Sequence, residues 1–386
     1  MKTVKVNRKA AERAASGHPW IFSSDVVERA EAEAGDVVRV VDPRGRLLGV
    51  AHYSSTSQIT LRLLLTDKAE AIDRSFFLRR LSAAIGHRER VVEGSDACRL
   101  VYSEGDLLPG LIVDRYGPYL VMQTLDQGME RARDLIVNCL TELLAPAGIL
   151  GRNDASVRKL EGLPQETTVL AGDIPERVVI EMNGLKLEVD LLHGQKTGVY
   201  LDQRENYMAV SRHARGKVLD CFTSAGGFAL HAAGRVESVE AVDSSAPALA
   251  IAEANARANA ITNVQFRQAD VFEFLAGIER RYGMVILDPP AFAKSRKSLE
   301  DAARGYKEIN LRALRLLDVG GVLVTCSCSH HMSEAMLLET IAEAALDAGK
   351  TLRVLERRTQ AQDHPILLTV PETHYLKCLI LEVVGG

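Results

Sequence analysis

The sequence predicts an α/β protein. A Rossmann-like domain with a seven-stranded mixed sheet is expected to follow a β-rich domain and a small central α+β domain. From about residue 216, strand and helix patterns alternate through five βα units, and two more strand patterns close the chain. Such alternation is typical of a parallel sheet with helices on both faces. The first 70 residues instead form short strand patterns broken by Gly and Pro. We therefore expect domains at 1–70, 71–188 and 189–386.

Turn residues and apolar periodicity place the elements of the first two domains. In the β-rich domain, the turn Asp42–Gly45 separates a β-branched strand from the next strand. The helix of the central domain carries apolar side chains on one face, at the spacing of an amphipathic helix. The expected strands are 36–41, 47–51, 59–63, 100–102, 110–114 and 119–122, with helices at 74–92 and 129–144 and further strands up to residue 191.

The predicted sheet of the third domain determines where a ligand would bind. Its strands are expected at 217–221, 238–243, 263–266, 284–288, 321–325, 351–356 and 375–383, with helices at 227–233, 246–259, 271–281, 301–317 and 334–348. In an open α/β sheet, ligands bind outside the carboxyl ends of the strands. The residues that follow each parallel strand are therefore the candidates for a site.

Bulk composition is that of a globular protein without membrane spans. The chain has 386 residues, 47% of them hydrophobic and 25% charged, with a net charge of −4. It has no apolar run of about 18 residues, and its N-terminus lacks the apolar core of a signal peptide. The cysteines show neither a disulfide framework nor a C-x-x-C pair. We expect a cytoplasmic protein with no membrane contact.

Positive charge is concentrated at the N-terminus. The first thirteen residues carry five basic side chains and Glu12; the basic ones are Lys2, Lys5, Arg8, Lys9 and Arg13. On a mildly acidic protein, a local basic arm fits a specific RNA contact better than general electrostatic binding. A solvated tail is the alternative interpretation.

The loop after the first sheet strand indicates the cofactor. It runs from Asp220 to Phe228 and contains Gly226 and Gly227. Glycines at this place let a ligand approach the backbone at the N-terminus of the next helix. NAD would require G-x-G-x-x-G, which the loop lacks. S-adenosylmethionine (SAM) has no phosphate and carries a cationic end, so a loop that bears an acid suits it better.

Acids at three successive strand ends support SAM. We expect Asp220 to bind its amino group, Asp243 its ribose hydroxyls and Asp270 its adenine amine. Caps of strand-to-helix turns are the alternative roles for Asp220 and Asp270. The complete set of candidate cofactor residues is Asp220, Phe222, Ser224, Gly226, Gly227, Asp243, Asp270, Asp288 and Pro289.

An acid followed by two prolines ends the fourth strand. The rings of Pro289 and Pro290 fix an extended chain, which would hold Asp288 near the methyl donor and within reach of a base edge. Asp-Pro-Pro also occurs where an exocyclic amine is methylated. In that chemistry an aromatic residue usually follows the second proline directly, whereas Ala291 precedes Phe292 here.

A thiol at the end of the fifth strand separates these chemistries. An amine already has a lone pair, whereas carbon 5 of a pyrimidine becomes nucleophilic only after a thiolate adds to carbon 6. Cys328 is the candidate nucleophile, because strands four and five are expected side by side. Inert packing is the alternative. We expect a packing role for Cys326, two residues earlier.

The cysteines and two histidines do not form a predicted metal site. The spacing of Cys326, Cys328, His330 and His331 is wrong for zinc. We expect both histidines in a loop near the substrate, and the sequence does not show whether one of them removes the carbon-5 proton.

Five motifs of this chain resemble those of PUA-domain class I SAM-dependent 23S rRNA (cytosine-5-)methyltransferases, an RlmI-like family. They are Gly17–Phe22, His193–Asn206, Cys221–Phe228, Leu287–Phe292 and Ser327–Ser329. The resemblance implies an RNA-binding PUA domain, a central domain and a SAM-dependent catalytic domain. It also implies that Cys328 is the nucleophile. A sister group that methylates a guanine ring nitrogen shares Asp-Pro-Pro but lacks this cysteine.

The same resemblance implies roles for the segment before the sheet. Residues around Gln195 to Arg204 would fold over the cofactor or the substrate, while Lys196 and Arg204 could instead meet RNA phosphate. A target base must leave its stack, and Tyr200 or Phe292 could support it by stacking.

We therefore predict a SAM-dependent enzyme that makes 5-methylcytosine in 23S rRNA or in a large ribosomal subunit precursor. The second interpretation is an rRNA methyltransferase that acts on a nitrogen of guanine or adenine, in which Cys328 has no catalytic role. An RNA-binding assembly factor with a vestigial pocket is the third. The resemblance is also compatible with a homodimer.

Overall fold

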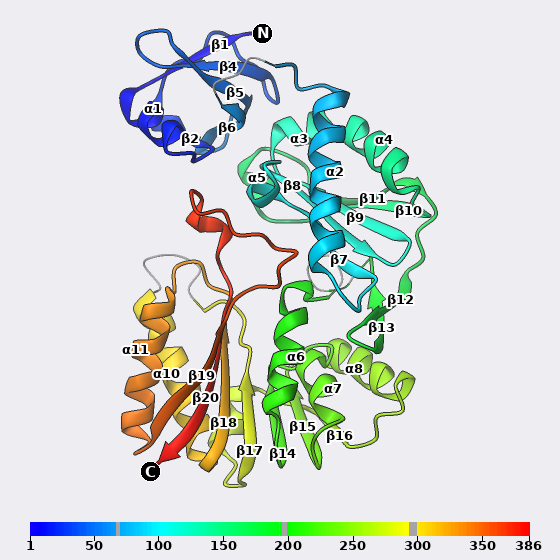
Figure 1. The fold of residues 1–386 in the computed structure, drawn as a ribbon, viewed down its shortest axis with the longest axis vertical. Coiled ribbons are helices and arrows are strands. Elements are labelled where there is room, and N and C mark those ends of the chain that lie inside the picture. The colour runs from blue at the N-terminus through cyan, green and yellow to red at the C-terminus, as the bar shows by residue number, and fades with distance from the viewer. Residues whose placement is uncertain (67–69, 193, 195–198, 293–298) are drawn as a thin grey trace. The chain divides into compact units, whose positions relative to one another are not determined.

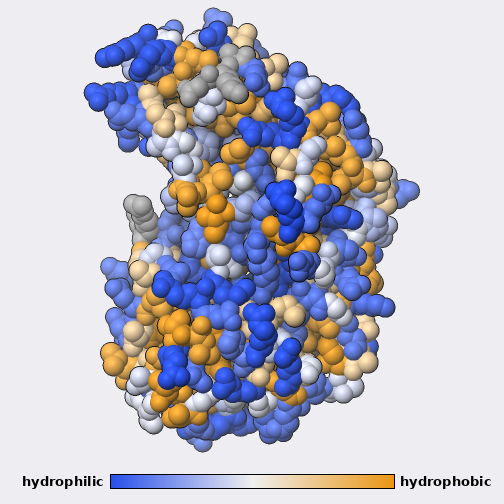
Figure 2. Space-filling view, viewed as in Figure 1, coloured by the Kyte–Doolittle hydropathy of each residue, from blue (hydrophilic) through white to orange (hydrophobic). Residues whose placement is uncertain are grey.

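The computed structural model describes residues 1–66, 70–192, 194, 199–292 and 299–386. These residues divide into two compact units (Figure 1). Unit 1 contains Met1–Ile180, Asp190–Gly198 and Gln362–Thr373, and unit 2 contains Glu181–Val189, Val199–Ala361 and His374–Gly386. On the face shown in Figure 2, hydrophilic and hydrophobic side chains are interspersed over both units. None of the helices that the structure describes is both long and apolar enough to cross a lipid bilayer.

The β-rich part of unit 1 is a six-stranded sheet in the order β2-β6-β5-β4-β1-β3. Its elements are β1 (Thr3–Val6), α1 (Arg8–Ala15), β2 (Trp20–Phe22), η1 (Ser23–Asp25), β3 (Val26–Glu28), β4 (Val37–Val41), β5 (Leu47–Tyr53) and β6 (Ile59–Thr66). The basic N-terminus is therefore a paired strand and a helix, not the arm or tail that its charge predicts. The reason is the alternation in β1, which buries Val4 and Val6 completely and leaves Lys5 on the other face.

The central part of unit 1 is a five-stranded sheet in the order β11-β10-β9-β8-β7. Figure 1 labels its strands. Its elements are α2 (Arg74–Val91), β7 (Ala97–Tyr102), η2 (Ser103–Asp106), β8 (Leu111–Tyr116), β9 (Tyr119–Thr124), α3 (Gln127–Arg131), α4 (Arg133–Leu144), β10 (Gly148–Asn153), α5 (Val157–Leu160) and β11 (Glu166–Gly172). The helix predicted at 129–144 is two helices. The first begins at the cap Asp126, whose carboxylate accepts from Met129 N–H at 2.8 Å.

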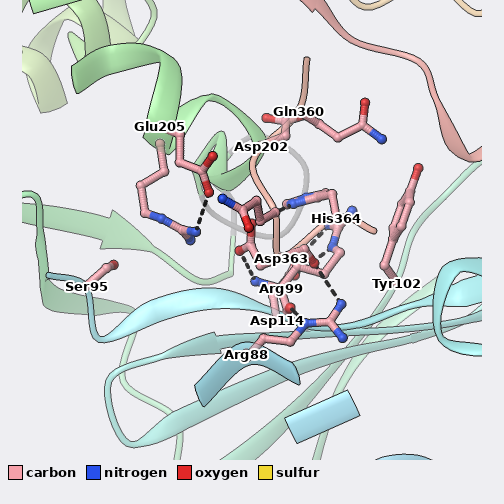
Figure 3. Close-up of polar contacts among 12 residues, drawn as sticks. Arg88, Ser95, Arg99, Tyr102, Asp114, Asp202, Glu205, Gln360, Asp363 and His364 are labelled. Atoms are coloured by element: carbon pink, nitrogen blue, oxygen red, sulfur yellow. Dashed lines mark hydrogen bonds and ion pairs between the residues drawn. The ribbon is translucent and has the colours of Figure 1, made fainter. Parts of the chain in front are cut away.

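A late segment of the chain, Gln362–Thr373, belongs to unit 1 through buried polar contacts (Figure 3). The Asp363 carboxylate accepts from the backbone N–H of Arg99 at 2.9 Å. The backbone carbonyl of Asp363 accepts from Arg88 Nη2 at 2.7 Å. Arg99 also forms a bidentate pair with the fully buried Asp114, at 2.8 Å for each bond. Charged groups buried in this way are stable because each has charged or hydrogen-bonded partners.

Unit 2 contains the predicted Rossmann-like sheet, in the order β16-β15-β14-β17-β18-β20-β19. The five strands from β16 to β18 are parallel, and β20 is antiparallel to both β18 and β19. The strands are β14 (Lys217–Cys221), β15 (Ser238–Asp243), β16 (Val264–Gln268), β17 (Tyr282–Leu287), β18 (Leu317–Ser327), β19 (Thr351–Arg358) and β20 (Lys377–Gly385). The predicted fold class is confirmed.

Helices cover both faces of this sheet (Figure 1). They are α6 (Arg204–His213), α7 (Gly227–Ala233), α8 (Ala246–Ala258), α9 (Val271–Ala276), α10 (Leu299–Arg315) and α11 (Glu334–Asp347). The remaining elements of the chain are η3 (Leu201–Gln203), η5 (Pro371–Thr373, in unit 1) and the hairpin strands β12 (Arg177–Met182) and β13 (Leu185–Asp190). Leu219 and Cys221 point into a core shared with α9, α10 and α11. Because side chains alternate along a strand, Asp220 points to the opposite face, toward α7.

Candidate active site

The candidate site lies at the carboxyl ends of four neighbouring parallel strands of unit 2. Cys221 at the end of β14 is in register with Val242 on β15 and with Leu287 on β17, and Leu287 is in register with Thr325 on β18. The strands thus end at one edge of the sheet, and the residues that follow them are brought together. These include Asp243, Asp288 and Cys328.

Asp220 is a buried carboxyl group with one oxygen left unsatisfied. Its Oδ2 accepts from Thr223 Oγ1 at 2.6 Å and from Ala229 N–H at 3.0 Å. Its Oδ1 is buried without a hydrogen-bond partner among the residues that the structure describes. Burial, assisted by the nearby charges of Asp288 and Asp243, raises the pKa of Asp220 to about 7. An unsatisfied buried acceptor is costly unless a ligand supplies a donor.

The turn between β14 and α7 has an unusual backbone, which Asp243 supports. Phe222 and Ser224 have positive φ angles of 63° and 49°, in a region that non-glycine residues rarely adopt. Asp243 Oδ2 accepts from Ser224 N–H and its Oδ1 accepts from Ser245 N–H, both at 2.8 Å. The carboxylate therefore ties the turn to the end of β15. Each of its oxygens retains a lone pair for a further donor.

The two glycines of the turn meet protein neighbours. Gly226 has a φ of 86°, which a residue with a side chain adopts only with strain. A Cβ on Gly227 would lie 2.4 Å from the ring of Tyr207. Tyr207 in turn stacks on His231, with ring centroids 5.0 Å apart. Gly227 thus allows a tyrosine ring to approach the helix start, a packing role that the loop motif alone did not indicate.

Asp270 caps a helix. It lies exposed between β16 and α9, and its Oδ1 accepts from Glu273 N–H at 3.0 Å. This is the cap geometry that was the alternative to adenine binding.

Asp288 is held by a glutamine that the sequence reasoning did not single out. Gln203 Nε2 donates to Asp288 Oδ2 at 3.1 Å, and Gln203 Oε1 accepts from Asn206 Nδ2 at 2.7 Å. Gln203 and Asn206 are buried. The sheet strand β17 ends at Leu287, directly before Asp288, and of the two prolines that follow, Pro289 is buried and Pro290 is exposed. The signal for Gln203 was its place in the motif His193–Asn206.

Cys328 is half-buried and follows β18, whereas the other five cysteines, including Cys326, are buried. Its surroundings are aromatic and charged. Burial raises the pKa of Tyr200, and the charges of Asp288 and Cys328 add to that shift. The pKa of Tyr306 is raised in the same way. The Tyr306 hydroxyl donates to Ser327 Oγ at 2.9 Å, which anchors the end of β18.

A second residue that sequence reasoning missed is Lys377, at the start of β20. Its side chain is 4% exposed, and its Nζ donates to the carbonyls of Ser329 and Tyr375 at 2.7 and 2.9 Å. Burial lowers the pKa of Lys377 to about 8, partly offset by the charges of Cys328 and Glu334. No local motif surrounds this lysine, so the sequence held no signal for it.

The remaining predicted site residues are distributed as follows. Tyr200 is half-buried before η3, and the Arg204 side chain is only 2% exposed. Phe292 packs against Tyr306, with ring centroids 4.8 Å apart. Lys196 lies outside the described residues. In unit 1, Lys5 is half-buried on β1, while Arg8 and Lys9 are exposed on α1. Arg8 pairs there with Glu12 at 2.7 Å. In unit 2, His330 and His331 are both exposed.

Comparison with known proteins identifies the family. A PUA-like domain matches residues 4–66, and an S-adenosylmethionine-dependent methyltransferase matches residues 132–381. Proteins named ribosomal RNA large subunit methyltransferase I, from Tolumonas auensis and Aeromonas salmonicida, are 42% and 44% identical to this chain. The alignments cover 95% and 94% of this chain and 96% and 95% of those relatives.

Solved structures agree in fold. A Streptococcus mutans protein described as a SAM-dependent methyltransferase is 21% identical, with a TM-score of 0.84, and the match covers 99% of this chain and 100% of that one. A methyltransferase structure that holds S-adenosylhomocysteine gives a TM-score of 0.86 at the same identity and coverage.

Fold and matching models together define a class I SAM-dependent methyltransferase with an N-terminal PUA-like domain. Within that class, the chain belongs to the ribosomal RNA large subunit methyltransferase I family. The predicted family, enzyme class and cofactor are confirmed.

Proposed function

We propose that this enzyme methylates carbon 5 of a cytosine in 23S rRNA, and that Cys328 is the nucleophile. Large-subunit rRNA as substrate is supported by the names of the relatives. The observation that carries the carbon-5 chemistry is the half-buried Cys328 thiol, which follows the strand adjacent to the one that ends before Asp288. Methylation of an amine would need no such thiol.

The residues at the strand ends fit SAM, which supplies an electrophilic methyl group when bound. The unsatisfied Asp220 Oδ1 is an acceptor suited to the SAM ammonium. Asp243 would accept from the ribose hydroxyls through its remaining lone pairs. Backbone groups of the turn at Phe222, Ser224 and Gly226 and the ring of Pro289 would line the same site. For Asp270, the free face of the carboxylate would serve the adenine amine in addition to its cap.

The chain's own residues then carry out the following steps. The Cys328 thiolate adds to carbon 6 of the cytosine, forming an S–C bond and moving an electron pair toward carbon 5. Carbon 5 would take the methyl group as the bond between that methyl and the cofactor sulfur breaks, and S-adenosylhomocysteine would be the leaving group. Carbon 5 then loses its proton to a base, and the electron pair released expels the Cys328 thiolate by breaking the S–C bond, which restores the ring. The Asp288 carboxylate, fixed by Gln203, would accept a hydrogen bond from the cytosine amine and orient the base.

Recognition of the RNA would involve both units. A flipped base would stack on Tyr200 or Phe292. The PUA-like domain, with Lys5, Arg8 and Lys9, would contact the RNA backbone. Roles for Lys196 and Arg204 at the cofactor or at an RNA phosphate are part of the same proposal.

A covalent trap tests the nucleophile. RNA that contains 5-fluorocytosine should form a SAM-dependent adduct with the wild-type enzyme, because fluorine cannot leave as a proton. Cys328→Ala should abolish both the adduct and methyl transfer to normal RNA. Cys326→Ala is the matched control, since that thiol lies two residues away and is fully buried; it should still form the adduct.

The adduct is read on a denaturing gel and located by peptide mass spectrometry. Full methyl transfer by Cys328→Ala would overturn the carbon-5 assignment in favour of nitrogen chemistry. An adduct mapped to another cysteine would overturn the assignment of Cys328.

A further inference from the structure

Lys377 is a buried cation whose amine bonds to the loop that carries Cys328. On β20 it is in register with Ser327, the last residue of β18. Buried lysines are rare unless they are paired. Among the described residues, none gives Lys377 a carboxylate partner within ion-pair distance; its amine bonds instead to two carbonyl oxygens.

These two hydrogen bonds place the amine at the loop that carries the thiol. The register partner of Lys377 is Ser327 and its acceptor is Ser329, so Lys377 contacts the chain on both sides of Cys328. An ammonium group has three N–H donors, and the carbonyls of Ser329 and Tyr375 use two. No described residue accepts from the third. The charge of Cys328 raises the pKa of Lys377, against the larger lowering effect of burial.

Several described groups near Cys328 do not favour a thiolate. Asp288, which follows the neighbouring strand, is an acid. Tyr200 and Tyr306 are neutral phenols whose pKa values are raised by burial and further by the charges of Asp288 and Cys328. Glu334, at the start of α11, adds negative charge near Lys377. His330 is exposed and packs against Tyr375, with ring centroids 5.5 Å apart. The lysine charge would therefore stabilise a thiolate at this place.

We propose that Lys377 is the positioning residue for the nucleophile: its ammonium, anchored on the Ser329 and Tyr375 carbonyls, fixes the Cys328 loop and stabilises the thiolate. This inference rests on the proposed role of Cys328. A cation within about 4–6 Å favours a charged neighbour by about one to three pH units. Because burial brings the pKa of Lys377 itself to about 8, the lysine would lose this effect in alkaline solution.

The test follows the pH dependence of Cys328 alkylation by iodoacetamide in the full-length protein, with peptide mass spectrometry as the readout. Thiolate is the reactive form, and the other five cysteines are buried, so the modification should be selective. Three variants separate charge from anchoring. Lys377→Met removes both, Lys377→Gln removes the charge but keeps an amide donor for the carbonyls, and Lys377→Arg keeps the charge.

We expect the alkylation midpoint to rise by about one pH unit in Lys377→Met and Lys377→Gln, with about tenfold slower alkylation at pH 7. Lys377→Arg should stay close to the wild type. A wild-type midpoint in Lys377→Gln would overturn the proposal, even if Lys377→Met fails to fold. Because alkylation needs neither SAM nor RNA, that result would leave the Cys328 assignment intact, and only the 5-fluorocytosine trap would decide it.

Discussion

Asp220→Asn should make unit 2 less sensitive to pH. In the folded protein Asp220 is fully buried with a pKa near 7, against an ordinary value of 3.8. The folded state therefore keeps a proton that the unfolded chain releases between about pH 4 and pH 7. Since the folded state binds more protons over this window, its stability falls as pH rises through it. Asparagine does not titrate and removes this loss.

The size of the effect follows from the width of that window. At about 1.4 kcal/mol per pH unit, a folded-state pKa of about 7 against 3.8 corresponds to a loss of roughly 4 kcal/mol between acid and alkaline solution. An asparagine carbonyl can still accept from Thr223 and Ala229, and its amide nitrogen takes the place of the unsatisfied Oδ1. In Asp220→Asn, the unsatisfied amide nitrogen costs about 1–3 kcal/mol at every pH. This cost therefore cancels when the stability of the variant is compared at two pH values.

Amide hydrogen exchange measures this in the intact protein without assuming a single unfolding step. Peptides that cover β14 and β17 report on unit 2, and peptides that cover β8 and β9 in unit 1 are the internal control. Between pH 4 and pH 8, opening free energies of β14 should fall in the wild type by several kcal/mol more than in Asp220→Asn. Parallel pH dependence of β14 in both proteins would refute the argument, because Asp220 would then be ionised in the folded state.

Two further predictions concern packing and RNA binding. Gly227→Ala places a Cβ 2.4 Å from the Tyr207 ring and should destabilise unit 2 by about 1–3 kcal/mol, measured by the same exchange experiment. Gly234→Ala is the control, because a Cβ there meets nothing within 4 Å. Equal stability of the two variants would contradict the packing role of Gly227. Replacing Lys5 and Lys9 together with alanine should weaken rRNA binding and reduce the slope of log K against log salt by about 1–2, measured by filter binding; an unchanged slope would remove these lysines from the RNA interface.

Much of unit 2 was determined by local sequence. The predicted strand at 217–221 coincides with β14, and the helix at 227–233 coincides with α7. Apolar β-branched runs bounded by turn residues carry this information without reference to distant residues. The acids at the strand ends were also visible, because the carboxyl edge of a parallel sheet is where a ligand binds.

Tertiary structure alone decided which distant residues meet. Pairing of β18 with β20 brings Lys377 to the loop that carries Cys328, where its amine bonds to Ser329, 48 residues earlier in the chain. Gln203 and Asp288 also meet, although they are 85 residues apart. It also decided that Gln362–Thr373 belongs to unit 1, through Asp363 and its arginine partners. Local periodicity predicts which face of an element is buried, but it does not predict which other element packs against that face.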